Sequence, residues 1–124
     1  MFSQEGCARD AWVHRVEGEY HMIYMAGESV FLRRSDDCLT WSSDPVEIFT
    51  TQGKGVPESP MVVAQGGLFY LFWTIHDGTH GNYDNRTYVM CSDSPDDFHG
   101  RPVLCMLQAH APELVRLDDD HWFI

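Results

Sequence analysis

Apolar residues in this chain come in short runs that are separated by glycine-containing or acidic turns. Runs of this kind, rich in aromatic and β-branched side chains and bounded by turn residues, are typical of β-strands. No stretch keeps the period of an amphipathic helix between capping residues, so we expect no long helix. The pattern therefore predicts an all-β protein.

The same strand–turn–strand pattern occurs three times along the chain. Residues 11–24 match residues 60–73 at an offset of 49, and each segment reads as an apolar strand, a glycine turn and an aromatic-rich strand. A third copy begins at Pro112, at an offset of 52 from the second, and its turn is the acidic stretch 118–120. Repetition at a fixed period indicates a repeat architecture.

Each of the first two copies continues in a similar way. A third strand ends in Ser-Asp at 35–36 and again at 92–93, an acidic turn follows, and a fourth short strand is expected at 46–49 and at 102–106. Four antiparallel strands in about 50 residues are typical of a propeller blade. We expect one partial propeller domain over residues 1–124, with blades at 8–56 and 57–108 and a truncated blade at 109–124.

A propeller needs about 4–8 blades to close. This chain supplies about two and a half, counted at the blade period. We therefore expect further blades to come from a longer parent chain or from self-association.

The charge of the chain narrows the choice of partners. Its 124 residues include 19 acidic and 8 basic side chains, which gives a formal net charge of −11. Nucleic-acid binding needs clustered Lys and Arg, and anionic membranes attract basic segments. No apolar run approaches the ~18–20 residues of a membrane helix, and no signal peptide is visible. We expect no nucleic-acid partner, no membrane partner and a cytoplasmic location.

The cysteines and histidines suggest no metal site. The four cysteines, at positions 7, 38, 91 and 105, form no CxxC pair, and the seven histidines form no HExxH motif. The apolar content is sufficient for a core without cross-links. We expect four reduced thiols, with neither a disulfide framework nor a structural zinc ion.

The candidate chemistry lies where the innermost strand of each blade begins beside the central axis. Asp10, Glu58 and His110 stand at these starts, so we expect one titratable side chain from each unit in a common region. Two carboxylates that converge on one cavity are the groups used in glycoside hydrolysis. The alternative is that these side chains only cap the first turn of each strand.

The strand starts at residues 8–13, 58–63 and 110–115 resemble recurring motifs of the five-bladed propeller glycoside hydrolases of families 43, 32 and 68. The acidic turn at 35–41, Ser-Asp-Asp-Cys-Leu-Thr-Trp, is similar to their blade turn. The resemblance extends from about residue 7 to residue 124. It implies an incomplete five-bladed β-propeller, a carbohydrate substrate and no organic cofactor, and it leaves room for a central structural cation such as calcium.

The resemblance also implies roles for four residues. Glu58 matches the general acid, and Asp10 matches the Asp of an Arg-Asp-Pro motif that holds sugar hydroxyls or tunes the acid. Arg9 matches the arginine of that motif, as a partner of Asp10 or of the sugar, and His110 is placed to contact the sugar. The Asp expected in a preceding blade has no counterpart, so the isolated chain is expected to lack hydrolytic activity.

Two questions stay open on the sequence alone. The chain could instead be a non-catalytic propeller that binds carbohydrate or protein, with Glu58 in a structural role. The long loop at 74–85 either borders a sugar site or is a plain surface loop.

Overall fold

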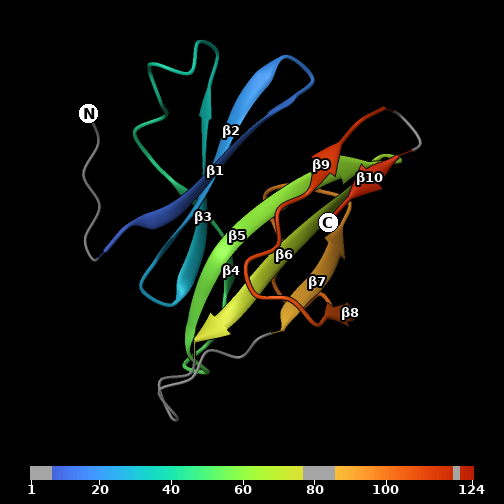
Figure 1. Ribbon diagram of the computed structural model, residues 1–124. Helices are drawn as coiled ribbons and strands as arrows, with labels where there is room; N and C mark the ends of the chain where they lie inside the picture. Colours follow the sequence, from blue (N-terminus) through green and yellow to red (C-terminus); the bar gives the residue numbers. More distant parts are fainter. Residues whose placement is uncertain (1–6, 77–85, 119–120) are drawn as a thin grey trace.

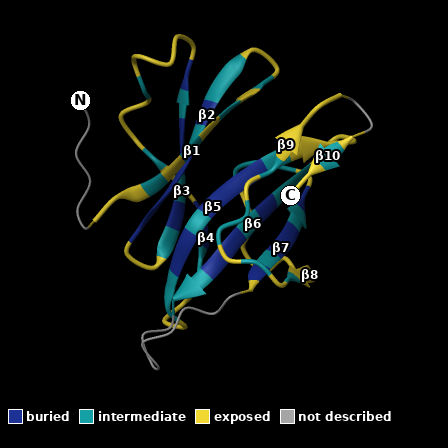
Figure 2. Ribbon diagram, viewed as in Figure 1, coloured by how far each residue is buried: buried dark blue, intermediate teal, exposed yellow. Residues whose placement is uncertain are grey.

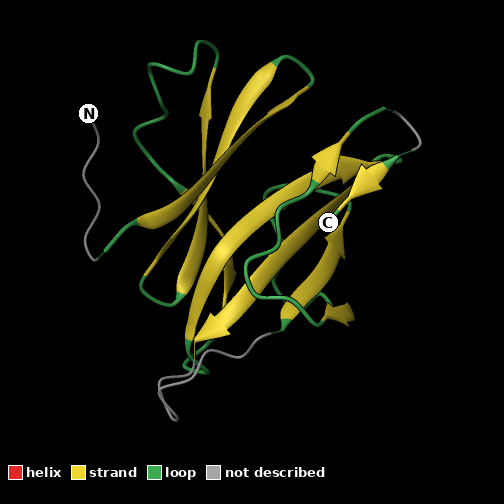
Figure 3. Cartoon of the chain, in the orientation of Figure 1, coloured by secondary structure: helices red, strands yellow, loops and turns green. Residues whose placement is uncertain are grey.

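The computed structural model describes residues 7–76, 86–118 and 121–124, and its described part is built from strands and turns without a helix (Figures 1 and 3). Two four-stranded sheets and one two-stranded hairpin follow one another along the chain. The first sheet consists of β1 (Arg9–Val16), β2 (Glu19–Ala26), β3 (Ser29–Ser35) and β4 (Val46–Thr50). The second consists of β5 (Val56–Gln65), β6 (Leu68–His76), β7 (Thr87–Ser92) and β8 (Val103–Leu107), and the hairpin of β9 (Val115–Arg116) and β10 (Trp122–Phe123).

Both sheets are antiparallel meanders with the strands in chain order. The prediction of four antiparallel strands per repeat unit is therefore confirmed. The third copy is shorter than expected, because β9 and β10 pair over only two residues each.

The first hairpin of each blade has the same two-residue turn, which accounts for the glycine that recurs at this place in the sequence. The β1–β2 turn places Glu17 at φ 50° and Gly18 at φ 99°, and the β5–β6 turn places Gly66 at φ 61° and Gly67 at φ 78°. Two consecutive positive φ angles are the requirement of a type I′ hairpin, whose twist matches that of the strands. Each turn thus fixes the register of the first two strands of its blade.

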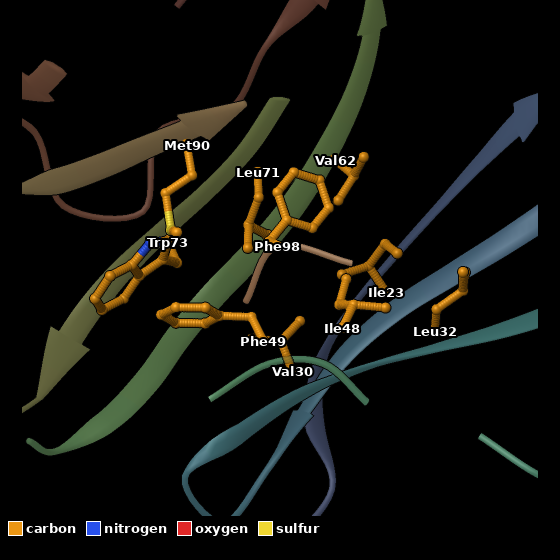
Figure 4. Packing of buried hydrophobic residues seen from close by; sticks show 10 residues of the cluster. All are labelled: Ile23, Val30, Leu32, Ile48, Phe49, Val62, Leu71, Trp73, Met90 and Phe98. Carbon is orange, nitrogen blue, oxygen red and sulfur yellow. The ribbon is translucent and has the colours of Figure 1, made fainter. Parts of the chain in front are cut away.

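The two blades share one hydrophobic core, which lies between the sheets (Figures 2 and 4). Ile23 and Ile48 reach into it from the first blade, and Val62, Leu71 and Phe98 from the second, and all five are fully buried. The backbone N–H of Phe98 also donates to the carbonyl of Ile48 at 2.8 Å. The packing holds the first strands of the two blades next to each other.

Candidate functional site

The first strands of both blades bulge at corresponding places. Two residues of β1, Asp10 and Ala11, stand opposite one residue of β2, and two residues of β5, Ser59 and Pro60, stand opposite one residue of β6. The first residue of each bulge has a left-handed backbone, with φ 57° at Asp10 and 48° at Ser59. A bulge of this kind bends the strand and redirects its side chains.

The third unit has the same backbone feature ahead of its first strand: Ala111 also has φ 48°, whereas β9 begins only at Val115, later than the start at 110–112 that the sequence analysis expected. Residues 110–112 are called the third strand start below because they correspond to the starts of β1 and β5.

The two bulges therefore make Asp10 correspond to Ser59 and Arg9 correspond to Glu58. The positive φ of Ala111 makes Ala111 and His110 the corresponding residues of the third unit. The three titratable residues expected in a common region thus do not share one position, because Asp10 lies one residue after the position that corresponds to Glu58 and His110. The offset of 49 residues found in the sequence already pairs Arg9 with Glu58.

An ion pair connects the two blades at this point. The Nη2 atom of Arg9 lies 2.7 Å from Oε1 of Glu58. The Glu58 side chain is 6% exposed, whereas that of Arg9 is 42% exposed. The hydrogen bond to Glu58 raises the pKa of Arg9, so the guanidinium stays charged. Arg9 was expected to pair with Asp10 or with the sugar, and its partner in the structure is Glu58.

Asp10 makes a second connection between the same strand starts. Its Oδ2 atom accepts a hydrogen bond from the backbone N–H of Ser59 at 3.0 Å. Because Ser59 directly follows Glu58, the Asp10 carboxylate lies beside the backbone that carries Glu58. The structure thus brings together three of the predicted site residues: Arg9, Asp10 and Glu58.

A pair of buried threonines, which the sequence analysis missed, supports the third strand start. Thr74 Oγ1 accepts from the N–H of Ala111 at 3.4 Å and lies 3.1 Å from Thr87 Oγ1. Thr87 Oγ1 donates to the carbonyl of Ala109 at 2.8 Å. These contacts hold the backbone on both sides of His110, whose own side chain is exposed. Thr74 and Thr87 stand opposite each other on β6 and β7. The sequence analysis missed this pair because it assigned Thr74 to the loop 74–85, whereas β6 continues to His76.

The three strand starts surround a cavity of about 200 Å³. Asp10, Ser59 and Ala111 line it, as do the residues that follow them, including Glu113. Glu113 is a carboxylate that the sequence analysis did not select. Glu58 is not part of this lining, because its side chain is turned into the ion pair with Arg9.

The described residues do not supply a complete metal site. Within 7–76, 86–118 and 121–124, no group of three or more His, Cys, Asp or Glu side chains could hold a metal ion. The strand starts therefore do not provide a ligand set for the central cation that the resemblance leaves room for. All four cysteines are free thiols in the structure.

Two further observations bear on earlier expectations. In the part of the chain that the structure describes, no helix is long and apolar enough to span a membrane. Most of the loop considered as a border of a sugar site, residues 77–85, lies outside the described residues.

No family model matches the chain, and no curated protein matches it at a significant level. The chain does match solved structures. A thermostable family-43 glycoside hydrolase aligns with a TM-score of 0.63 at 17% identity, over 82% of this chain and 40% of its own. A family-43 β-1,3-galactosidase solved with galactodeoxynojirimycin gives 0.61 at 18% identity, over 80% of this chain and 33% of its own.

The α-L-arabinanase of Cellvibrio cellulosa aligns with a TM-score of 0.58 at 16% identity, over 93% of this chain and 42% of its own. The chain thus spans less than half the length of each of these structures. The predicted fold class, an incomplete five-bladed β-propeller, is confirmed, and the chain has the fold of a part of the family-43 glycoside hydrolase propellers.

Proposed function

We propose that this chain is part of a glycoside hydrolase in which Glu58 is the general acid. The observation that carries the proposal is the meeting of Glu58 and Asp10 at neighbouring strand starts, through the Arg9–Glu58 ion pair and the Asp10–Ser59 hydrogen bond. Two carboxylates on neighbouring strand starts suit acid–base cleavage of a glycosidic bond. The family-43 hydrolases with the same fold support a carbohydrate as the substrate.

In this proposal Glu58 gives its proton to the glycosidic oxygen as that bond breaks, and Asp10, which lines the cavity, holds sugar hydroxyls. Arg9 holds Glu58 in an ion pair in the structure, so the pair has to open and Glu58 has to take up a proton from solvent before it can act as the acid. The second catalytic carboxylate, which attacks the sugar or activates water, is provided by another part of the protein. Acid–base chemistry of this kind needs no organic cofactor, and we propose none.

One observation favours the alternative of a non-catalytic binding propeller. Glu58 is 5% exposed and already paired, an arrangement that could serve only to join two blades. In that case the cavity at the strand starts would bind carbohydrate or protein without cleaving it.

The two functions differ in how Glu58→Gln, made in the longer protein that supplies the second carboxylate, responds to the leaving group. For an alkyl glycoside, which needs protonation, we expect loss of the general acid to lower kcat by about 10²–10⁴-fold. For a dinitrophenyl glycoside, whose leaving group departs without a proton, the loss should be small. The exposed Glu47 on β4 provides the control variant Glu47→Gln.

An equal loss with both substrates would show that Glu58 acts through structure rather than as an acid. Unchanged turnover of the alkyl glycoside would reject Glu58 as the acid outright. Saccharide binding without any hydrolysis would support the binding propeller.

A further inference from the structure

A second, larger cavity of about 390 Å³ lies between the two blades. Its walls come from β4 and the loop after it in the first blade, and from β6, β7 and the residues around Arg101 in the second. It shares no lining residue with the cavity at the strand starts. It is therefore separate from the proposed catalytic site.

Three aromatic rings form one wall of this inter-blade cavity. Trp73 lies between the other two, with its ring centroid 4.8 Å from that of Phe49 and 4.9 Å from that of Tyr88, which it stacks on at 23°. Figure 4 shows Phe49, Trp73 and Met90 side by side, and all three line the cavity. Such a wall offers an apolar surface to a bound ligand.

Trp73 carries an unused hydrogen-bond donor. The residue is 7% exposed, and within the described structure its Nε1 atom has no hydrogen-bond partner. Buried N–H groups are rarely left without an acceptor, so such a group needs an explanation. The Nε1 atoms of Trp12 and Trp122 are also buried without a partner among the described residues. Only Trp73 of the three lines this cavity, and here an acceptor atom on a bound ligand would provide a partner.

The charged side chains of the lining are cationic although the chain is strongly acidic. Lys54 and Arg101 line the cavity, and no Asp or Glu is among the described residues that do so. Lys54 is the single lysine in a sequence with a net charge of −11. Arg101 also contacts Asp93 at 2.8 Å, but the Asp93 side chain is 76% exposed and so competes only weakly with a ligand.

We propose that this inter-blade cavity binds a carboxylate-bearing saccharide unit, a uronate. The sugar ring lies against the aromatic wall and the carboxylate faces Lys54 and Arg101. The hydroxyls meet Thr50 and Gln52, and one acceptor oxygen takes the hydrogen bond from Trp73 Nε1. Anionic charge selects the ligand, since both ionic groups of the lining are positive.

Titration of the full chain with glucuronate, followed by NMR, tests the site directly. The sequence holds four tryptophans, and we expect the indole N–H signal of Trp73 to shift while those of Trp12 and Trp41 stay in place. Reductive methylation gives Lys54 a single lysine signal, which should shift together with Trp73. Glucose lacks the carboxylate and acetate lacks the sugar, so each should bind at least about fivefold more weakly, as expected for one lost hydrogen bond or ion pair.

Two variants separate the contributions of the Trp73 N–H and the Lys54 charge to glucuronate binding. Trp73→Phe keeps a ring in the wall and removes the N–H, and Lys54→Gln removes a charge from an exposed side chain. Each should weaken glucuronate binding by about fivefold or more, and Arg15→Gln, on the remote β1–β2 hairpin, should not. If Trp73→Phe does not fold, Lys54→Gln decides alone. Equal binding of glucose or acetate, no response at Trp73, or full affinity of Lys54→Gln would each overturn the proposal.

Discussion

At the scale of single residues, the most informative feature is the left-handed backbone at the three strand starts. Asp10, Ser59 and Ala111 have φ between 48° and 57°, although only glycine adopts this region without cost. The side chains at the three positions differ in chemistry, and the backbone conformation is the same. The repeat therefore preserves the direction of the chain at the cavity rather than one residue type.

The strain at Ser59 leads to a measurable prediction. Ser59→Gly relieves the left-handed conformation and should raise the free energy of unfolding by about 0.5–1 kcal/mol. Ala64→Gly, on the same strand β5 but with an ordinary backbone, should lower it by about 0.5–1 kcal/mol. Urea denaturation of both variants checks the pair, and a loss of stability in both would contradict the strain.

At the scale of elements, two short structures depend on a single titratable side chain. One is the acidic connection between β3 and β4. The other is the β1–β2 pair, where His14 and His21 stand opposite each other. Each makes the free energy of unfolding depend on pH, and the two pH ranges differ.

The β3–β4 connection is held by Asp37. Its Oδ1 atom accepts from the backbone N–H of Thr40 at 2.7 Å and of Leu39 at 2.8 Å. These bonds lower the pKa of Asp37 to about 2, from an ordinary value of 3.8. The charged carboxylate therefore stabilises the fold above about pH 4, and this contribution disappears as the pH falls through 2.

We expect Asp37→Asn to lower the Tm at pH 7, and the difference from the native chain to shrink between pH 4 and pH 2. The exposed neighbour Asp36 provides the control Asp36→Asn, for which little change is expected at either pH. Thermal denaturation at several pH values measures both. A difference that stays constant down to pH 2 would show that Asp37 acts through something other than its charge.

The histidine pair makes stability depend on pH in a higher range than Asp37 does. Burial, with a smaller contribution from His21, lowers the pKa of His14 to about 4 from 6.5. His21 also contacts Glu19 at 2.9 Å, which in turn contacts Arg34 at 3.1 Å. Below pH 6.5 His14 binds a proton in the unfolded chain but not in the folded one. The free energy of unfolding should therefore fall from pH 6.5 to pH 4 and then level off.

His14→Gln should remove most of that pH dependence, because glutamine does not titrate. His99→Gln, at an exposed site, should leave it in place. Denaturation midpoints at half-unit steps of pH show the slope directly. An unchanged slope in His14→Gln would assign the pH dependence to another group.

The sequence predicted the strands and hairpins well because local signals specify them. Two signals were sufficient to predict them: the glycine at the β1–β2 and β5–β6 turns, and the alternation of apolar runs with acidic turns. The offset of 49 residues aligns Arg9 with Glu58, but their ion pair was not predictable from it, because the contact depends on how the two blades pack against each other. The stack around Trp73 joins residues of three strands from two blades, which no local pattern records.

At the scale of the whole molecule, the two blades are parts of one folding unit. The connection between β7 and β8 reaches back to the first blade, where Phe98 is fully buried beside Ile48 and Asp96 pairs with Arg34. A core that draws on both sheets cannot be lost from one blade alone. The two blades should therefore unfold together.

Phe98→Ala tests this coupling. Removing a fully buried phenylalanine side chain should lower the free energy of unfolding by about 3–5 kcal/mol, although Phe98 lies in a connection outside the regular strands. Because the cavity left behind faces Ile48 as well as the second blade, amides of β2 and of β6 should lose protection by equal amounts in hydrogen exchange. Leu39→Ala, at a side chain that is 85% exposed, should change neither. Loss of protection in β6 alone would mean that the blades are separate units, and the meeting of Asp10 and Glu58 would then depend on the ion pair rather than on a shared core.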